Sequence, residues 1–267
     1  MNYFIEGLQG SGKSTLAERI SGLGGGRLYR EGDYSPVELA WCAYLSEAGY
    51  RAVLESYPAL RADIEAQTFQ ERDMRIVCYT RVKNGDTAFF KELEQHEIYN
   101  GRLSLREFRR VVLGRYERWD GGTDTAHAGG VFECSLFQNT VEDMMLFRDL
   151  PDAEIISFYR EVRSALEGKD YRIVYLKTED IAANLAVIRR ERSDEQGREL
   201  WFPLMMDYFN NSPYAKARGL SGEEALIAHF AHRQELELRI CGEYFSDKAV
   251  IVPSKGYTDA DLRKVLA

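Results

Sequence analysis

The feature that most constrains the fold of this chain is a glycine-rich loop close to its amino terminus. Residues 7–14 are Gly-Leu-Gln-Gly-Ser-Gly-Lys-Ser, and Thr15 follows them. They fit the phosphate-loop pattern G-x-x-x-x-G-K-[ST], in which glycines let the backbone wrap closely around a polyphosphate. Backbone N–H groups and the start of the next helix supply positive potential for the anion. The pattern therefore predicts a nucleoside triphosphate site.

The residues on either side of the loop have the patterns that such a site needs. Tyr3–Glu6 is typical of a strand, and after the loop Leu16 and Ile20 recur at helical spacing. In phosphoryl-transfer proteins of this kind the loop lysine bridges the β- and γ-phosphates and the next hydroxyl ligates Mg²⁺. We therefore expect ATP and Mg²⁺ as cofactors, with Lys13 on the phosphates and Ser14 on the metal. The residues predicted to bind the nucleotide are Gly7, Gln9, Gly10, Ser11, Gly12, Lys13, Ser14 and Thr15.

Further strand-like segments alternate with helical patterns along the chain. They lie at 27–30, 131–134, 173–176 and 250–252. Short apolar strands that alternate with helices predict an α/β fold with a mainly parallel sheet covered on both faces. We expect a single domain over residues 1–267, in which 57–120 form a mainly helical insert, the substrate lobe.

Two serine–glutamate pairs have the spacing of a capping box, which marks the start of a helix. The first pair is Ser35 and Glu38, and the second is Ser104 and Glu107. We therefore predict that one helix begins after Ser35 and another after Ser104.

Charge and hydropathy narrow the choice of partners. The 35 Lys and Arg residues against 43 Asp and Glu give a formal charge of -8, so no general basic field exists for nucleic acid. No apolar run approaches the roughly 20 residues that span a bilayer. The four cysteines are widely spaced, without metal-ligand pairing. We expect a cytoplasmic protein with a small-molecule phosphate acceptor, no nucleic acid and no membrane; a homodimer stays open.

Other classes of nucleotide-binding protein leave signatures that this chain lacks. A guanine-specific switch protein carries an Asn-Lys-x-Asp sequence, which is missing here. A motor or helicase has an apolar strand that ends in paired acids, whereas the strand at 131–134 offers only Glu133, followed by Cys134. These differences favour a small kinase.

Four short segments resemble the deoxynucleoside kinase and thymidylate kinase families. Residues 4–15 are similar to the opening of both families, and Arg30-Glu31 resembles the Arg-Glu of thymidylate kinases and the catalytic base of deoxynucleoside kinases. Residues 133–135, Glu-Cys-Ser, resemble the Glu-Arg-Ser element, with cysteine where that family has a phosphate-binding arginine. The segment from 174 into Arg189, Arg190 and Arg192 is similar to the lid that closes on the transferring phosphate.

The resemblance covers well under half of the chain, and it implies a fold and an activity. It implies a P-loop kinase fold, with a parallel five-stranded sheet in the order 2-3-1-4-5, that transfers the γ-phosphoryl group of ATP to a nucleoside or nucleotide. Two alternatives stay open. One is a kinase of another hydroxylated metabolite, sugar or antibiotic, because Glu31-Gly32-Asp33 is also similar to the Asp-x-Asp of shikimate-type kinases. The other is an ATP-binding regulatory protein without transfer activity.

The predicted catalytic residues are Lys13, Glu31, Asp33, Arg189 and Arg192. Glu31 is favoured as the base and Asp33 as the substrate contact, although acids ahead of a helix also serve its dipole. Glu133 follows two apolar residues at the end of a predicted strand, where ligands bind in open α/β sheets. We therefore predict that Glu133 joins Ser14 in holding Mg²⁺; an exposed glutamate at a strand end is the alternative.

Overall fold

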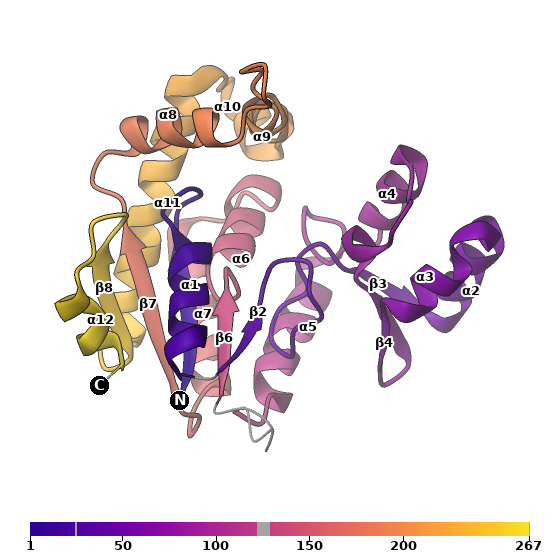
Figure 1. Ribbon diagram of the computed structural model, residues 1–267, viewed down its shortest axis with the longest axis horizontal. Helices are drawn as coiled ribbons and strands as arrows, with labels where there is room; N and C mark the ends of the chain where they lie inside the picture. The colour runs from indigo at the N-terminus through magenta and orange to yellow at the C-terminus, as the bar shows by residue number, and fades with distance from the viewer. Residues whose placement is uncertain (25, 122–128, 267) are drawn as a thin grey trace. The chain divides into compact units, whose positions relative to one another are not determined.

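The structure is a computed structural model, and it describes residues 1–24, 26–121 and 129–266. The chain forms two compact units, which Figure 1 shows as ribbons. The first unit contains the described residues of 1–28 and 120–267, and the second contains residues 29–119. Among the described residues, no helix has the length and apolarity needed to cross a membrane.

The first unit is built on a five-stranded sheet. Its strands are β1 (Asn2–Gly7), β2 (Arg27–Tyr29), β6 (Gly130–Glu133), β7 (Tyr171–Lys177) and β8 (Ala249–Pro253), in the spatial order β2-β6-β1-β7-β8. Strand β1 pairs in parallel with β6 and β7, and β7 pairs in parallel with β8. Numbered by chain order within this sheet alone, the strands lie in the order 2-3-1-4-5. All five predicted strand segments are therefore present, and the α/β expectation is confirmed.

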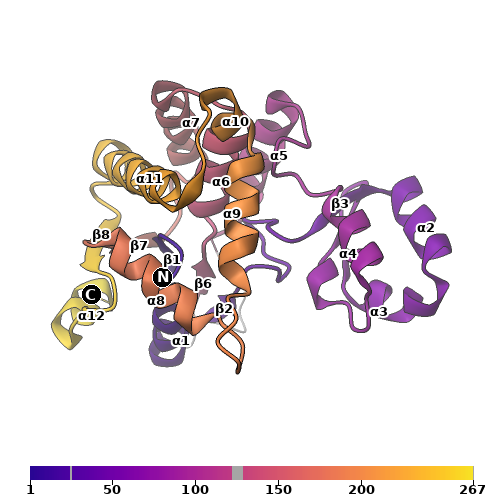
Figure 2. The same ribbon diagram turned by 90° about the horizontal axis from the view of Figure 1, so that it is seen from above.

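Helices cover both faces of this sheet (Figures 1 and 2). Helices α1 (Lys13–Gly24) and α12 (Asp259–Leu266) lie on one face, and α6 (Gln138–Glu142), α7 (Asp152–Ala165) and α11 (Gly222–Tyr244) lie on the other. Side chains of a strand alternate between faces, so Tyr3 and Ile5 join Leu16 in one core. Phe4 points to the opposite face and stacks on Phe132, with ring centroids 5.2 Å apart. The remaining helical elements of this unit are the π-helical turn η3 (Asp143–Phe147), α8 (Ile181–Glu191), α9 (Trp201–Asn211) and α10 (Pro213–Arg218).

The second unit combines helices with a small antiparallel sheet. Its strands are β3 (Ala43–Ser46), β4 (Thr68–Glu71) and β5 (Met74–Val77), in the order β3-β5-β4. Its helices are α2 (Glu47–Ser56), α3 (Arg61–Ala66), α4 (Thr87–Glu94) and α5 (Leu105–Arg118), with 3-10 turns η1 (Pro58–Leu60) and η2 (Tyr79–Arg81). Phe89, Ile64 and Val53 belong to a separate core. Within the predicted lobe, 57–120, lie the helices α3, α4 and α5 and the two short strands β4 and β5, which the sequence did not predict, and its role as a substrate lobe stays a prediction.

One predicted capping box is present and the other is not. The side chain of Ser104 accepts the backbone N–H of Glu107, and the carboxylate of Glu107 accepts that of Ser104, which starts α5 as predicted. The helix predicted after Ser35 is wrong, because residues 35–42 contain no helix. There the Ser35 hydroxyl accepts the N–H of Val37, and the Glu38 carboxylate accepts the N–H groups of its next two residues and the hydroxyl of Tyr99.

Candidate functional site

The glycine-rich loop joins β1 to α1, and its glycines occupy conformations that other residues avoid. Gly7, Gly10 and Gly12 have φ values of 137°, 71° and 94°. A Cβ atom on Gly7 would lie 2.6 Å from the carbonyl oxygen of Leu176 in β7. A Cβ on Gly10 would lie 2.0 Å from Cγ1 of Ile188 in α8. The loop is thus a tight cradle of backbone that has room for no side chain at these two positions.

Lys13 is the first residue of α1, and its ammonium group turns back onto the loop. The side chain is buried, and Nζ donates hydrogen bonds to the carbonyl oxygens of Gly7 at 3.0 Å and Leu8 at 2.7 Å. The positive charge is therefore held against the loop by two of the backbone carbonyls that precede it. The ammonium group of Lys13 therefore lies at the amino end of helix α1, and a cation at a helix amino end favours the binding of phosphate.

Ser14 and Glu133 lie together, although 119 residues separate them. The Ser14 hydroxyl donates a hydrogen bond to the Glu133 carboxylate. Glu133 is the last residue of β6 and lies opposite Ile5 of β1, so the parallel register brings its side chain to the loop. A hydroxyl and a carboxylate are oxygen donors of the kind that Mg²⁺ prefers, and a Mg²⁺ ion usually takes its other ligands from water and substrate phosphates. The two residues therefore fit the predicted metal site.

Another loop residue has an unused hydrogen-bonding group. The side chain of Ser11 is buried, and its Oγ has no hydrogen-bond partner among the described residues. The Ser11 carbonyl accepts the hydroxyl of Ser254 at 2.9 Å, which ties the loop to the end of β8. A buried hydroxyl without a partner is uncommon and calls for a ligand or a functional explanation. A phosphate oxygen is an acceptor that would satisfy it.

Glu6, immediately before the loop, is a site residue that the sequence analysis did not select. Its buried carboxylate accepts the backbone N–H groups of Leu136 at 2.7 Å and Gln138 at 3.4 Å. These bonds fix the turn that follows Glu133. Burial raises the pKa of Glu6 to about 8, against the lowering effect of the Leu136 N–H group and of Lys13. A charged residue inside an otherwise apolar strand was the signal that could have identified it.

Behind the loop, a fully buried arginine on α11 contacts the side chain of Gln9. Arg233 donates to the Gln9 side-chain oxygen at 2.8 Å and to the Glu142 carboxylate at 3.0 Å, and its Nε lies 3.3 Å from Glu237. Burial alone would raise the pKa of Glu142, but the charges of Arg233 and His229 lower it to about 2. Arg233 therefore holds the loop through Gln9. Its spacing from Glu237 is that of an ion pair along one helix face.

Helix α8 touches the loop, while Arg189 on this helix and Arg192, the C-cap residue after it, contact other partners. Asn184 donates to the Gln9 carbonyl at 2.9 Å, and Ile188 lies beside Gly10. Arg189 pairs with Glu199 at 2.7 Å and Glu223 at 2.6 Å. The guanidinium of Arg192 lies 5.2 Å from the ring centroid of Trp201, and Arg190 is exposed. The roles of these arginines on a phosphate stay predictions.

Glu31 and Asp33 lie in the second unit, next to an arginine. The Asp33 carboxylate pairs with Arg81 at 2.7 Å and accepts the backbone N–H of Arg30 at 2.9 Å. The Glu31 carbonyl accepts the same guanidinium at 3.5 Å. Gly32 between the two acids has a φ of 83°, and a Cβ there would lie 2.8 Å from the Thr80 hydroxyl. A tight turn therefore holds the Asp33 carboxylate and the Glu31 carbonyl beside the Arg81 guanidinium.

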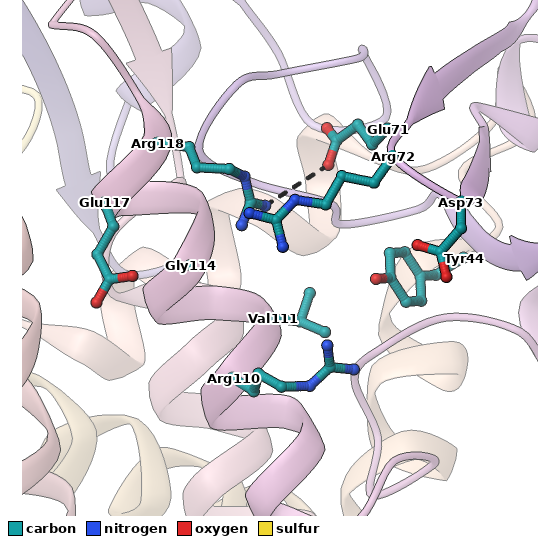
Figure 3. A pocket seen from close by; sticks show the side chains of 9 residues that line it. All are labelled: Tyr44, Glu71, Arg72, Asp73, Arg110, Val111, Gly114, Glu117 and Arg118. Atoms are coloured by element: carbon teal, nitrogen blue, oxygen red, sulfur yellow. Dashed lines mark ion pairs between the residues drawn. The ribbon is translucent and has the colours of Figure 1, made fainter.

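The second unit also contains an open pocket of about 220 Å³ between α5 and the turn that joins β4 to β5 (Figure 3). It is lined by Tyr44, Glu71, Arg72, Asp73, Arg110, Val111, Gly114, Glu117 and Arg118. Three arginines face three carboxylates in this set, and Arg118 lies 3.9 Å from Glu71. The charges balance, so the pocket has no strong preference for an anion.

The chain matches no protein-family model. It also matches no curated protein sequence. The features that define the site are a glycine cradle between a parallel strand and a helix, a lysine, and a serine–carboxylate pair.

Proposed function

We propose that this protein is an ATP- and Mg²⁺-dependent phosphotransferase of the P-loop kinase class. The observation that carries the proposal is the cradle at residues 7–15, where Lys13 lies against the loop and Ser14 meets Glu133. The strand order 2-3-1-4-5, with the loop after the first strand, supports the same class. The leading acceptor is a nucleoside or nucleotide, as the resemblance of residues 4–15 and 133–135 implies.

The residues of the cradle divide the work of holding a triphosphate. Backbone N–H groups at the start of α1 receive phosphate oxygens, and Lys13 neutralises charge on the β- and γ-phosphates. Ser14 and Glu133, which share a hydrogen bond, are the residues that would hold Mg²⁺. When bound, the metal neutralises the charge that develops on the transferring group. Gln9, held by Arg233, keeps the loop in shape.

The acceptor half of the reaction is assigned to the second unit and to α8. Glu31 acts as the base that accepts a hydroxyl proton, and Asp33 contacts the acceptor. Arg81, which pairs with Asp33, holds that carboxylate in place. Arg189 and Arg192 are proposed to approach the phosphates when α8 moves, which requires Arg189 to leave Glu199 and Glu223.

A turnover assay with a pooled set of acceptors tests the proposal. Purified protein with ATP and Mg²⁺ is expected to release ADP much faster when nucleosides or nucleotides are added, and splitting the pool identifies the acceptor. If a sugar, another hydroxylated metabolite or an antibiotic stimulates ADP release instead, the protein is a kinase of that compound and not of a nucleoside or nucleotide. Tight ATP binding without acceptor-dependent turnover would contradict the kinase assignment and favour a regulatory protein. If calorimetry detects no binding of Mg²⁺-ATP at millimolar concentration, the site itself is wrong.

A further inference from the structure

Two of the four cysteines lie opposite each other in the second unit. Strands β3 and β5 are antiparallel, with Ala43 opposite Val77. One step beyond this pair, just outside both strands, the same register places Cys42 opposite Cys78. The thiol of Cys42 donates to the Cys78 sulfur, with 3.6 Å between the two Sγ atoms. Both side chains are buried, at 0% and 1% exposure.

The backbone around this pair has the geometry that a cross-strand disulfide needs. The N–H of Cys42 donates to the Leu39 carbonyl, and the N–H of Cys78 donates to the Gln67 carbonyl in the opposite direction from β3. Neither N–H is donated to the opposite cysteine, and pairs of that kind within an antiparallel ladder have Cα atoms about 4.5 Å apart. Disulfides join Cα atoms about 4.4–6.8 Å apart. The sulfur atoms need to approach by about 1.5 Å to reach bonding distance.

Each cysteine contacts the backbone of one residue of the Asp33–Arg81 ion pair. The Cys42 sulfur lies 3.9 Å from the Asp33 carbonyl oxygen, in hydrogen-bonding geometry. The backbone N–H of Arg81 donates to the Cys78 carbonyl at 2.9 Å. The cysteine pair is therefore linked by these contacts to the backbone of both residues of the ion pair.

We propose that Cys42 and Cys78 are a redox modification site, a dithiol that a hydroperoxide converts reversibly into a disulfide and that thereby resets the Asp33–Arg81 pair. One sulfur attacks the hydroperoxide, the O–O bond breaks, and the sulfur becomes a sulfenic acid while the alcohol or water leaves. The second sulfur then attacks the first, an S–S bond forms, and water leaves. Two thiols are oxidised by two electrons and one peroxide is reduced. Formation of the bond is independent of the proposed function, whereas its effect on acceptor turnover rests on it.

The surroundings of the pair set the rate of oxidation. The hydrogen bond to Cys78 and burial raise the pKa of the Cys42 thiol, so little thiolate is present at neutral pH. We therefore expect oxidation over minutes to hours rather than seconds. A dithiol reductant reverses it by thiol–disulfide exchange.

Mass spectrometry of the whole chain tests the proposal without any assumption about nucleotides. The reduced chain has four free cysteines. After incubation with millimolar hydrogen peroxide we expect two thiols to be lost, a mass about 2 Da lower, and a non-reduced peptide that joins Cys42 to Cys78. The thermal midpoint of the oxidised protein is expected to rise by about 5 °C or more, since the bond closes a long loop. Dithiothreitol should restore all four thiols.

Matched variants identify the pair. Cys42→Ala and Cys78→Ala should each prevent the 2 Da loss, whereas Cys241→Ala, at a buried cysteine of the first unit, should leave it unchanged. Four thiols that survive in wild-type protein after several hours, or a link between other cysteines, would overturn the modification site.

In the acceptor assay we expect oxidation to raise the acceptor KM several-fold, reversibly and also in Cys241→Ala. A disulfide that forms without changing turnover would contradict the coupling to Asp33. If the protein shows no ATP turnover at all, the proposed function is wrong, whether or not the disulfide forms.

Discussion

Lys13 is the residue on which the proposed chemistry depends most directly. Its Nζ lies 3.0 Å and 2.7 Å from two loop carbonyls, so the charge is already positioned and little reorganisation is needed when phosphate arrives. We expect Lys13→Ala to reduce phosphoryl transfer by about 10²-fold or more, because one charged clamp and its positioning are lost together. Acceptor-dependent ADP release measures it. Lys91→Ala, at an exposed lysine of α4, is the control that should retain activity. Near-normal activity of Lys13→Ala would show that the site is elsewhere.

Glu133 should affect the metal rather than the nucleotide. Glu133→Gln keeps a partner for the Ser14 hydroxyl but removes the negative charge beside it. We expect the Mg²⁺ concentration for half-maximal turnover to rise by about 10- to 100-fold, which is typical for residues that orient a metal ligand. The affinity for ATP without metal should change little. If the Mg²⁺ requirement is unchanged, Glu133 has no part in the metal site.

Glu6 links the stability of the first unit to pH. Its pKa is raised from the ordinary 4.5 to about 8 by burial, so between these values the folded chain keeps a proton that the unfolded chain releases. The stabilisation is complete below about pH 4.5 and is lost as pH rises toward 8, with a slope of up to about 1.4 kcal/mol per pH unit.

Glu6→Gln carries no titratable group, and its side-chain oxygen can still accept the N–H of Leu136. Denaturant unfolding from pH 5 to pH 8 should therefore show a flatter dependence for this variant. Glu235→Gln, at an exposed position of α11, serves as the control with the same change of charge. An identical pH dependence in Glu6→Gln and wild type would contradict the raised pKa.

At the scale of elements, local patterns predicted those segments whose stabilising contacts are local. The capping box of α5 was predictable because both of its hydrogen bonds join Ser104 and Glu107. The same spacing at Ser35 and Glu38 failed because a distant residue, Tyr99, takes part in holding the Glu38 carboxylate, and the chain then enters strand β3. The central strands β1, β6 and β7 of the main sheet were visible because buried parallel strands are short continuous apolar runs, whereas β2 and β8 are only partly buried.

The packing of α8 against the loop leads to a prediction about Gly10. A Cβ there would lie 2.0 Å from Ile188 Cγ1, so Gly10→Ala must displace α8 or the loop. We expect it to weaken ATP binding and to lower the free energy of unfolding by about 1–3 kcal/mol. Adding Ile188→Ala should recover part of the ATP affinity, because it vacates the space, and the positive φ leaves the remainder unrecovered.

Gly242 on α11 is the matched control for a glycine-to-alanine change. It is an exposed helical residue, and a Cβ there would meet no atom within 4 Å. Gly242→Ala should raise the free energy of unfolding by about 0.5–1 kcal/mol and leave ATP binding unchanged. Calorimetric titration and denaturant unfolding of the variants measure both quantities. If Gly10→Ala behaves like Gly242→Ala, α8 does not pack on the loop as described.

At the scale of the whole molecule, the two units have separate hydrophobic cores among the residues that the structure describes. Leu16 lies in a core of the first unit and Phe89 in that of the second. We expect Phe89→Ala to lower the free energy of unfolding of the second unit by several kcal/mol, and Leu16→Ala to lower that of the first unit by a similar amount. The thermal midpoint of the affected unit should fall in each case. Saturating Mg²⁺-ATP should raise the transition of the first unit. Calorimetry of both variants, with and without nucleotide, checks this. If nucleotide raises only the transition of the second unit, the nucleotide does not bind at the glycine-rich loop.

The small antiparallel sheet of the second unit was not predicted from the sequence. The strands β3, β4 and β5 carry polar and charged residues such as Gln70, Glu71 and Arg75, and an antiparallel sheet with a solvated face gives only a weak alternating pattern. The buried contacts of Arg233 with Gln9 and Glu142 were equally hidden, because they join segments more than 90 residues apart. Such pairs are set by the topology of the sheet and not by spacing along the chain.

The stacking of Arg192 on Trp201 gives the protein an optical signal of its own. The indole belongs to α9 and meets the last residues of α8, with the guanidinium 5.2 Å from the ring. Indole emission is sensitive to a neighbouring charge, so any rearrangement of these two helices changes the light that Trp201 emits. With Trp41 and Trp119 replaced by phenylalanine, a stopped-flow trace could follow that rearrangement in real time, without a label.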